Sequence, residues 1–302
     1  MLLVSSDADA AEYGGDSLSH FASRGVVCDL TAFGSTGPLR GQPATDAQVQ
    51  AQSGVMKSTG LAGGPPMAIA LPLIEQLAGI YAASGVLAAL RRPRGQAVEI
   101  ALYDVAFSAM TSFLAPALGG TADEISRVGN RHTMAAPWNV YRASDGWVLL
   151  CAGNDEQWQR ICGLTGDPER GLAQRLAKNA GRVAHVDQVD ALVQAWVGEF
   201  TIAQCVESLS ALGIPCGPVA PIDGFPQEAN LLHRAMIFEA LGPSGRAIHL
   251  PGSPFRMSRS PGQPLLRLSA PDADREQVLG LLRGPRRFSD AANSDPSASS
   301  AR

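Results

Sequence analysis

The feature that most constrains the fold of this chain is a long apolar segment between Ala68 and Leu90. Glu75 and Gln76 interrupt it, so the uninterrupted part is shorter than the roughly 18–20 residues that a membrane-spanning helix needs. Pro72 suits the first turn of a helix, and the cations of Arg91-Arg-Pro-Arg94 suit its negative end. We therefore expect a helix buried in the core of a soluble protein rather than a membrane span.

Strand-like and helical segments alternate over the first 120 residues. The expected strands are short and apolar or alternate in polarity, and they are Leu2–Ser5, Val26–Phe33 and Val98–Leu102. Helical segments are expected at residues 17–23, 46–56 and 104–118, in addition to the apolar helix. This alternation is typical of an α/β fold.

The middle of the chain indicates a second, helix-rich α/β subdomain. Trp138–Arg142 and Trp147–Ala152 are expected to form a hairpin around the turn Ser144-Asp-Gly146. Helical periodicity then runs from Gln157 to Leu209, with a polar break at residues 163–170.

The last third is expected to contain less regular structure. Pro215–Val219 is strand-like and leads into a short helical region, and the chain after Ile248 is extended and rich in proline. A last helix is predicted over Asp272–Leu282. Residues 284–302 are rich in Ser, Asp, Ala and Arg, so we expect a disordered tail.

Charge and composition exclude several classes of partner and cofactor. The chain carries 24 basic and 28 acidic residues, with a net charge of -4, which argues against nucleic acid or an anionic membrane as partner. Five cysteines without a CxxC pair and five scattered histidines predict no metal site and indicate free thiols in a reducing compartment. The first residues lack the pattern of a signal peptide, so a cytoplasmic location is expected.

Nucleotide-binding, metalloprotease and hydrolase motifs are absent from the sequence, but an ordered series of short segments points to a family. Together they resemble family III CoA-transferases, the CaiB/BaiF-like group that includes formyl-CoA and carnitine CoA-transferases. The resemblance extends over roughly residues 25–260 and is carried by Ala32-Phe-Gly-Ser-Thr-Gly-Pro38, Val49-Gln-Ala-Gln-Ser-Gly-Val-Met56, Thr59-Gly60 with Pro65-Pro66, Leu77-Ala-Gly-Ile-Tyr81, Leu87-Ala-Ala-Leu90, Arg94-Gly-Gln-Ala-Val98, Leu102-Tyr-Asp104, Gly129-Asn-Arg-His132, Ala136-Pro137, Ser144-Asp-Gly-Trp147, Gly153-Asn-Asp155, Gly213-Ile-Pro-Cys-Gly-Pro218 and Pro251-Gly-Ser-Pro-Phe-Arg256.

The resemblance implies an architecture for the whole chain. It predicts a large domain with an open parallel sheet that begins in residues 1–130, a small domain at 131–222, and a return segment to the large domain at 223–283. Members of this family form interlocked dimers, which implies a homodimer, or a heterodimer with a homologous subunit. The family's first βαβ segment is expected to be missing here, because Leu2–Ser5 resembles a later strand.

The resemblance also implies a reaction and a nucleophile. In the family, an aspartate before the LxAGxY-like helix attacks an acyl-CoA thioester and then carries CoA as an enzyme-bound thioester. Here Glu75 stands at the matching position. Without the resemblance, this glutamate would be interpreted as a charge that complements the start of a helix; with it, Glu75 becomes the candidate catalytic residue.

Further residues are implied to bind the substrates, namely an acyl-CoA and a carboxylic acid. Gln50, Gly63 and Gly64 stand where the family lines its active site, whereas in isolation they are typical of a helix surface and a turn. The remaining candidates are cationic or imidazole side chains suited to phosphates or a carboxylate: Arg94, Arg127, Arg131 and His132. No cofactor is expected beyond the CoA thioester itself.

Two alternatives to CoA transfer stay open at this point. An α-methylacyl-CoA racemase of the same family needs a histidine before an aspartate, but Thr45 stands before Asp46 here. The other alternative is a catalytically degenerate or partner subunit of a CoA-transferase complex, which the short chain and the glutamate both favour.

Overall fold

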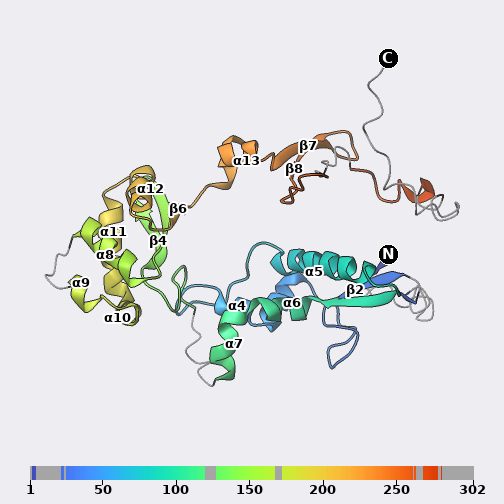
Figure 1. Cartoon of the computed structure of the whole chain (residues 1–302), viewed down its shortest axis with the longest axis horizontal. Helices are drawn as coiled ribbons and strands as arrows, with labels where there is room; N and C mark the ends of the chain where they lie inside the picture. Colours follow the sequence, from blue (N-terminus) through green and yellow to red (C-terminus); the bar gives the residue numbers. More distant parts are fainter. Residues whose placement is uncertain are drawn as a thin grey trace, which may run out of the picture. The chain divides into compact units, whose positions relative to one another are not determined.

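The computed structural model describes residues 2–4, 22–23, 25–119, 127–166, 172–260, 262, 268–277 and 280. The chain divides into two compact units, residues 1–219 and 220–302, and Figure 1 shows the elements of both. Each unit is described by itself.

A parallel sheet of three strands forms the first layer of the first unit. It contains β1 (Leu2–Val4), β2 (Val26–Thr31) and β3 (Gln96–Ala101), with β2 in the centre. Cys28 pairs with Leu3 on one side and with Val98 on the other. The predicted α/β fold with a parallel sheet is confirmed, and β2 is more buried than β3 because it has a strand on each side.

The apolar segment forms α5 (Leu73–Leu90), which lies along β2 and β3 (Figure 1). Its buried face consists of small or branched residues about one turn apart: Ile74, Ala78, Ala82, Val86 and Ala89. Close approach to the sheet requires small residues, because a Cβ at Gly85 would lie 2.8 Å from Val98 Cγ1.

The predicted core helix contributes one face to the core, and the described residues leave its other face uncovered. By length and composition α5 could cross a membrane, and 28% of it is buried. Its outer face exposes Ile80, Tyr81, Leu87 and Leu90. A helix that is apolar all round is usually covered on all sides, and the described part of this chain covers one of them.

The helix predicted at 46–56 is two helices, α3 (Asp46–Gln52) and α4 (Val55–Ser58). Gly54 separates them with a φ of +92°, a left-handed conformation that glycine adopts readily. Val49 and Val55 from these helices pack against Ile74 of α5.

The helix predicted at 104–118 is also interrupted. It begins earlier, at Leu102, and is divided at Met110 into α6 (Leu102–Ala109) and α7 (Thr111–Leu118). Val105 and Ala106 of α6 complete the cluster under the first turns of α5.

The second part of the first unit has its own antiparallel sheet and core. The predicted hairpin is confirmed as β4 (Trp138–Ala143) and β5 (Gly146–Cys151), and β6 (Cys216–Pro218) pairs with β5. The helices of this part are α8 (Asp155–Thr165), α9 (Leu172–Arg175), α10 (Asn179–Ala184), α11 (Val186–Gly198) and α12 (Ile202–Ala211). They enclose a core around Trp158, Val193 and Leu209.

The second unit contains short elements. A 3-10 helix, η2 (Ile222–Gln227), and α13 (Ala229–His233) match the predicted short helical region. The strands β7 (Ile237–Leu241) and β8 (Ala247–Pro251) form a hairpin that was not predicted. The tail at 284–302, parts of the helix predicted at 272–282, and most of the helix predicted at 17–23 lie outside the described residues.

Candidate functional site

A cavity of about 480 Å³ opens at the carboxyl end of β2, beside the first turns of α5. In open α/β sheets this end of the strands is the usual place for ligands. Its lining consists of Leu30, Thr31, Ala32, Pro43, Ala44, Glu75, Ala78, Gly79 and Leu102. Glu75 is the charged residue of this lining, and a Cβ at Gly79 would meet nothing within 4 Å.

The turn that follows β2 is held by side chains of the sheet. Gly34 N donates to Thr31 Oγ1 at 2.8 Å, and both the backbone N and the hydroxyl of Ser35 donate to the Glu99 carboxylate on β3. Gly34 adopts a φ of +94°, which explains a glycine at this point of the turn.

Glu75 is the third residue of α5 and its side chain is exposed. Among the residues that the structure describes, its carboxylate forms no hydrogen bond or ion pair. The positive end of the helix dipole favours an anion at this position.

The backbone N–H groups of the first turn of α5 are satisfied without Glu75. Leu73 N donates to Leu71 O at 2.8 Å and Gln76 N to Pro72 O at 3.1 Å. The amides of Ile74 and Glu75 itself both donate to Asp46 Oδ2, at 2.8 and 3.0 Å. The glutamate is therefore not used as a cap, the usual role of an acidic residue here.

Asp46 belongs to α3 and is buried together with Gln50, one turn further along. Gln50 Nε2 donates to Asp46 Oδ1 at 2.5 Å. The same side chain joins the backbone at residue 69, accepting from Ile69 N at 2.8 Å and donating to Ile69 O at 3.3 Å. Gln50 thus connects to Glu75 through Asp46 rather than facing the cavity itself.

The glycine loop at residues 60–66 is held by Arg127. Its Nη2 donates to Gly64 O at 2.5 Å and its Nη1 to Lys57 O at 3.2 Å, while Gly129 N donates to Gly60 O. Gly63 adopts a φ of +70° in this loop. Two donors of the Arg127 guanidinium are therefore occupied by backbone carbonyls.

The second part of the first unit, residues 138–218, is called the small subdomain below. Arg131 forms ion pairs with two aspartates of its helix α11, Asp187 at 2.7 Å and Asp190 at 2.6 Å. Burial alone would lower the pKa of Arg131, but its hydrogen bonds to the two aspartates raise it. Tyr141 donates its hydroxyl to Asp190 at 2.6 Å, and burial followed by the charge of Asp190 raises the pKa of Tyr141. Arg131 is thus engaged in a polar network on α11.

His132 lies next to this network. Its Nδ1 accepts from Met134 N at 3.0 Å, and its ring lies 5.0 Å from that of Trp138. Neither Arg131 nor His132 belongs to the lining of the cavity beside Glu75.

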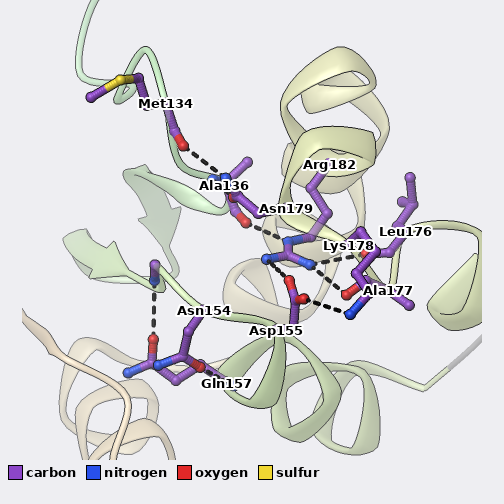
Figure 2. Close-up of polar contacts among 11 residues, drawn as sticks. Met134, Ala136, Asn154, Asp155, Gln157, Leu176, Ala177, Lys178, Asn179 and Arg182 are labelled. Atoms are coloured by element: carbon purple, nitrogen blue, oxygen red, sulfur yellow. Dashed lines mark hydrogen bonds and ion pairs between the residues drawn. The ribbon is translucent and has the colours of Figure 1, made fainter.

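The segment after His132 is clamped to α10, as Figure 2 shows. Asn179 accepts from Ala136 N at 3.2 Å and donates to Met134 O at 2.8 Å. The fully buried Arg182 donates to Ala136 O at 2.6 Å. Backbone conformation here is therefore fixed by two side chains of one helix.

Arg94 is exposed beyond the far end of α5. From Glu75 to Leu90 the helix rises roughly 22 Å, at about 1.5 Å per residue. Arg94 is thus separated from Glu75 by the length of the helix.

Among the predicted residues, the structure brings Glu75 and Gln50 together, with Asp46 between them. It also brings Arg127 into contact with Gly64. Sequence reasoning treated Asp46 only as a possible racemase residue and missed its contact with α5. The available signal was the polar pair Asp46 and Gln50, four residues apart on one helix face. Within the described ranges, no group of three or more His, Cys, Asp or Glu side chains is arranged to hold a metal ion.

Comparisons with known proteins assign the chain to a family. The model of the family described as "CoA-transferase family III" matches residues 4–276. An acetyl-CoA:oxalate CoA-transferase from Acetobacter aceti is 30% identical over 83% of this chain and 66% of its own length. A succinate–glutarate CoA-transferase from Agrobacterium fabrum is 29% identical over 83% of this chain and 64% of its own length. The chain thus spans just under two thirds of these relatives.

Solved structures show the same fold. A CAIB/BAIF family protein from Brucella suis superposes with a TM-score of 0.74 at 24% identity, covering 90% of this chain and 72% of that one. Rv3272 from Mycobacterium tuberculosis gives a TM-score of 0.70 at 24% identity, covering 85% of this chain and 69% of that one. Because the family model matches nearly the whole length of this chain, the chain belongs to CoA-transferase family III.

Proposed function

We propose that this protein transfers CoA from an acyl-CoA thioester to a carboxylic acid, with Glu75 as the nucleophile. The main observation in support is that Glu75 lines a cavity at the carboxyl end of β2, while the backbone amides in the first turn of α5 form hydrogen bonds with other groups. Relatives at up to 30% identity are named as transferases of this kind. The proposal needs no cofactor beyond the CoA thioester and places the protein in the cytoplasm.

In the proposed reaction, Glu75 forms two covalent intermediates in turn, a mixed anhydride and a CoA thioester. Its carboxylate attacks the thioester carbon, which forms a C–O bond, breaks the C–S bond and releases CoA as a thiolate. The thiolate then attacks the glutamyl carbonyl of this mixed anhydride, which gives a glutamyl-CoA thioester and the first carboxylate product. The acceptor carboxylate reverses both steps, leaving a new acyl-CoA and free Glu75.

The racemase alternative has less support in the described residues. Both carboxylate oxygens of Asp46 already accept hydrogen bonds, from Gln50 and from two amides of α5, so this group is engaged as a cap. The cavity lining contains no histidine. Two bases on opposite sides of a substrate carbon are therefore not provided.

A second candidate is a subunit that works with a homologous chain. A relative that is 27% identical is named the beta subunit of a succinyl-CoA–L-malate CoA-transferase. The exposed apolar face of α5 favours association, either as a homodimer or as a heterodimer. Sedimentation velocity across micromolar dilution tests this, and a single stable monomer would contradict it.

The test of Glu75 uses the covalent adduct. Incubation with acetyl-CoA or succinyl-CoA without acceptor is expected to leave a CoA thioester on the peptide that carries Glu75. Borohydride reduces this species and hydroxylamine traps it, and mass spectrometry identifies either product. Glu75→Gln keeps the shape but removes the attacking anion, so adduct and exchange with oxalate or glutarate are expected to disappear.

The matched control is Glu207→Gln, an exposed glutamate on α12, which is expected to retain full activity. Glu75→Asp is expected to remain active, since it keeps the carboxylate and restores the family's usual side-chain length. If wild-type protein never forms the adduct with any tested acyl-CoA, either alone or after mixing with a homologous subunit, the proposal fails.

A further inference from the structure

We infer that Asp46 is a positioning residue that keeps the Glu75 carboxylate available by occupying the amides with which Glu75 would otherwise pair. The inference rests on the proposed role of Glu75 as nucleophile. Asp46 Oδ2 accepts from both Ile74 N and Glu75 N, the two amides that a side chain normally caps at this point of a helix.

The start of a helix is a poor place for a free nucleophile, since exposed N–H groups attract any nearby carboxylate. In a capping box, the side chain of a glutamate at the third helical position folds back and accepts a hydrogen bond from the N–H of the residue before the helix. Pro72 occupies that place and has no N–H. With the next amides taken by Asp46, Glu75 has no competing donor in the first turn.

Asp46 is itself held in one orientation. It is 7% exposed, and Gln50 Nε2 contacts its Oδ1 at 2.5 Å. Gln50 cannot turn its amide over, because Ile69 N donates to its Oε1 at 2.8 Å. The chain of contacts from Ile69 through Gln50 to Asp46 therefore fixes the oxygen that reaches α5.

The first test is Asp46→Ala. Freed amides of Ile74 and Glu75 are expected to draw the Glu75 carboxylate back onto the helix. A displacement of about 1 Å costs on the order of a hundredfold in rate, so kcat and the rate of adduct formation are expected to fall by ~10–100-fold. KM for acyl-CoA is expected to stay within about twofold, because Asp46 is buried and does not belong to the lining of the cavity.

The matched control is Asp145→Ala, which removes another aspartate cap. Asp145 Oδ1 accepts from Ile202 N at 2.7 Å, at the start of α12. This variant is expected to lose stability without losing kcat. Equal kcat in Asp46→Ala and in wild type would overturn the inference.

A rescue experiment separates positioning from general loss of structure. Asp46→Asn keeps an oxygen for the α5 amides but turns an NH₂ group toward Gln50 Nε2, so kcat is expected to fall. Adding Gln50→Glu supplies an acceptor for both that NH₂ group and Ile69 N but loses the bond to Ile69 O. The double variant is therefore expected to recover part of the lost kcat. If Asp46→Ala does not fold, this pair carries the test, and a double variant no better than Asp46→Asn contradicts the inference.

A crystal structure of Asp46→Ala distinguishes failure of this inference from failure of the proposed function. A Glu75 carboxylate bonded to Ile74 N supports the positioning role even if the wild-type protein transfers no CoA. A Glu75 side chain that still points into the cavity contradicts the role, even if the wild-type protein is active.

Discussion

The buried guanidinium of Arg182 in the small subdomain allows a stability prediction to be worked out from contacts (Figure 2). Its side chain is 0% exposed and donates to Ala136 O, Leu176 O and Ala177 O at 2.6, 3.0 and 3.1 Å. Its Nη2 lies 3.0 Å from Asp155 Oδ1, an ion pair without the angle of a hydrogen bond. Its guanidinium carbon also lies 5.6 Å from the Trp158 ring centroid.

Arg182→Met keeps the apolar stem and removes the charge. Three hydrogen bonds from a charged donor are worth ~1.5–3 kcal/mol each, but methionine avoids the several kcal/mol that burial of a charge costs. Arg182→Met leaves three buried or partly buried backbone carbonyls without their donor, at ~1–3 kcal/mol for each unsatisfied group. With the cost of burying the charge removed, we expect a net loss of ~3–5 kcal/mol. For a domain of this size the melting midpoint then falls by more than about 10 °C.

Intrinsic fluorescence is the appropriate assay, because all four tryptophans lie between Trp138 and Trp196 in this subdomain. The matched control is Lys178→Met. The Lys178 side chain is 86% exposed, and its ammonium lies 3.4 Å from the same Asp155 carboxylate. Exposed ion pairs contribute ~1 kcal/mol or less, so the control is expected to melt near the wild type. Equal midpoints for Arg182→Met and Lys178→Met would refute the reasoning.

Two further predictions concern pH and glycine. Burial alone would raise the pKa of Asp155, but the ion pair with Arg182, followed by the ion pair with Lys178, lowers it. Its contribution is therefore present above the ordinary aspartate pKa of ~3.9 and is lost below it; Asp155→Asn is expected to remove this acid dependence of the fluorescence midpoint. Gly95→Ala would place a Cβ 2.3 Å from Ala22 O, so a loss of about 3 kcal/mol is expected in thermal unfolding followed by circular dichroism. Gly163→Ala, in open space on α8, is the control and is expected to stabilise by ~0.5–1 kcal/mol.

Local signals were sufficient for the elements whose ends are marked in the sequence. The hairpin around Ser144-Asp-Gly146 and the helix after Pro72 carry their turn and start residues beside them. The break at Gly54 and the hairpin of β7 and β8 were missed. Both depend on backbone conformation or pairing that residue type alone does not specify.

The candidate site was only partly predictable, because the charge of a side chain does not determine which group it pairs with in the fold. Arg127, Arg131 and Arg182 have the same chemistry, but their partners are loop carbonyls, two aspartates and a buried backbone segment. Burial of Arg182 could not be expected from its polar surroundings at residues 178–182. Asp46 and Glu75 are 29 positions apart, and only the packing of α3 against α5 brings them together.

The same packing makes Pro72 a test of how Glu75 is kept free. Pro72→Ala restores an N–H at the residue before α5, where a glutamate at the third helical position can close half of a capping box. We expect the Glu75 carboxylate to take this donor part of the time and kcat to fall several-fold, with KM for acyl-CoA unchanged. Pro221→Ala, at the residue before η2, is the matched control and is expected to leave kcat unchanged.

The unfolding free energy of Pro72→Ala provides a second measurement. A proline-to-alanine change by itself lowers stability by ~0.4–1 kcal/mol, because it increases the conformational entropy of the unfolded chain. A new bond between the amide of residue 72 and Glu75 would offset part of this cost. The offset is expected to vanish when Glu75→Ala is combined with Pro72→Ala, so the two changes are non-additive in unfolding free energy. Additive unfolding energies together with an unchanged kcat would mean that the first-turn amides do not compete for Glu75. In that case the freedom of its carboxylate has to come from the open cavity rather than from Asp46 and Pro72.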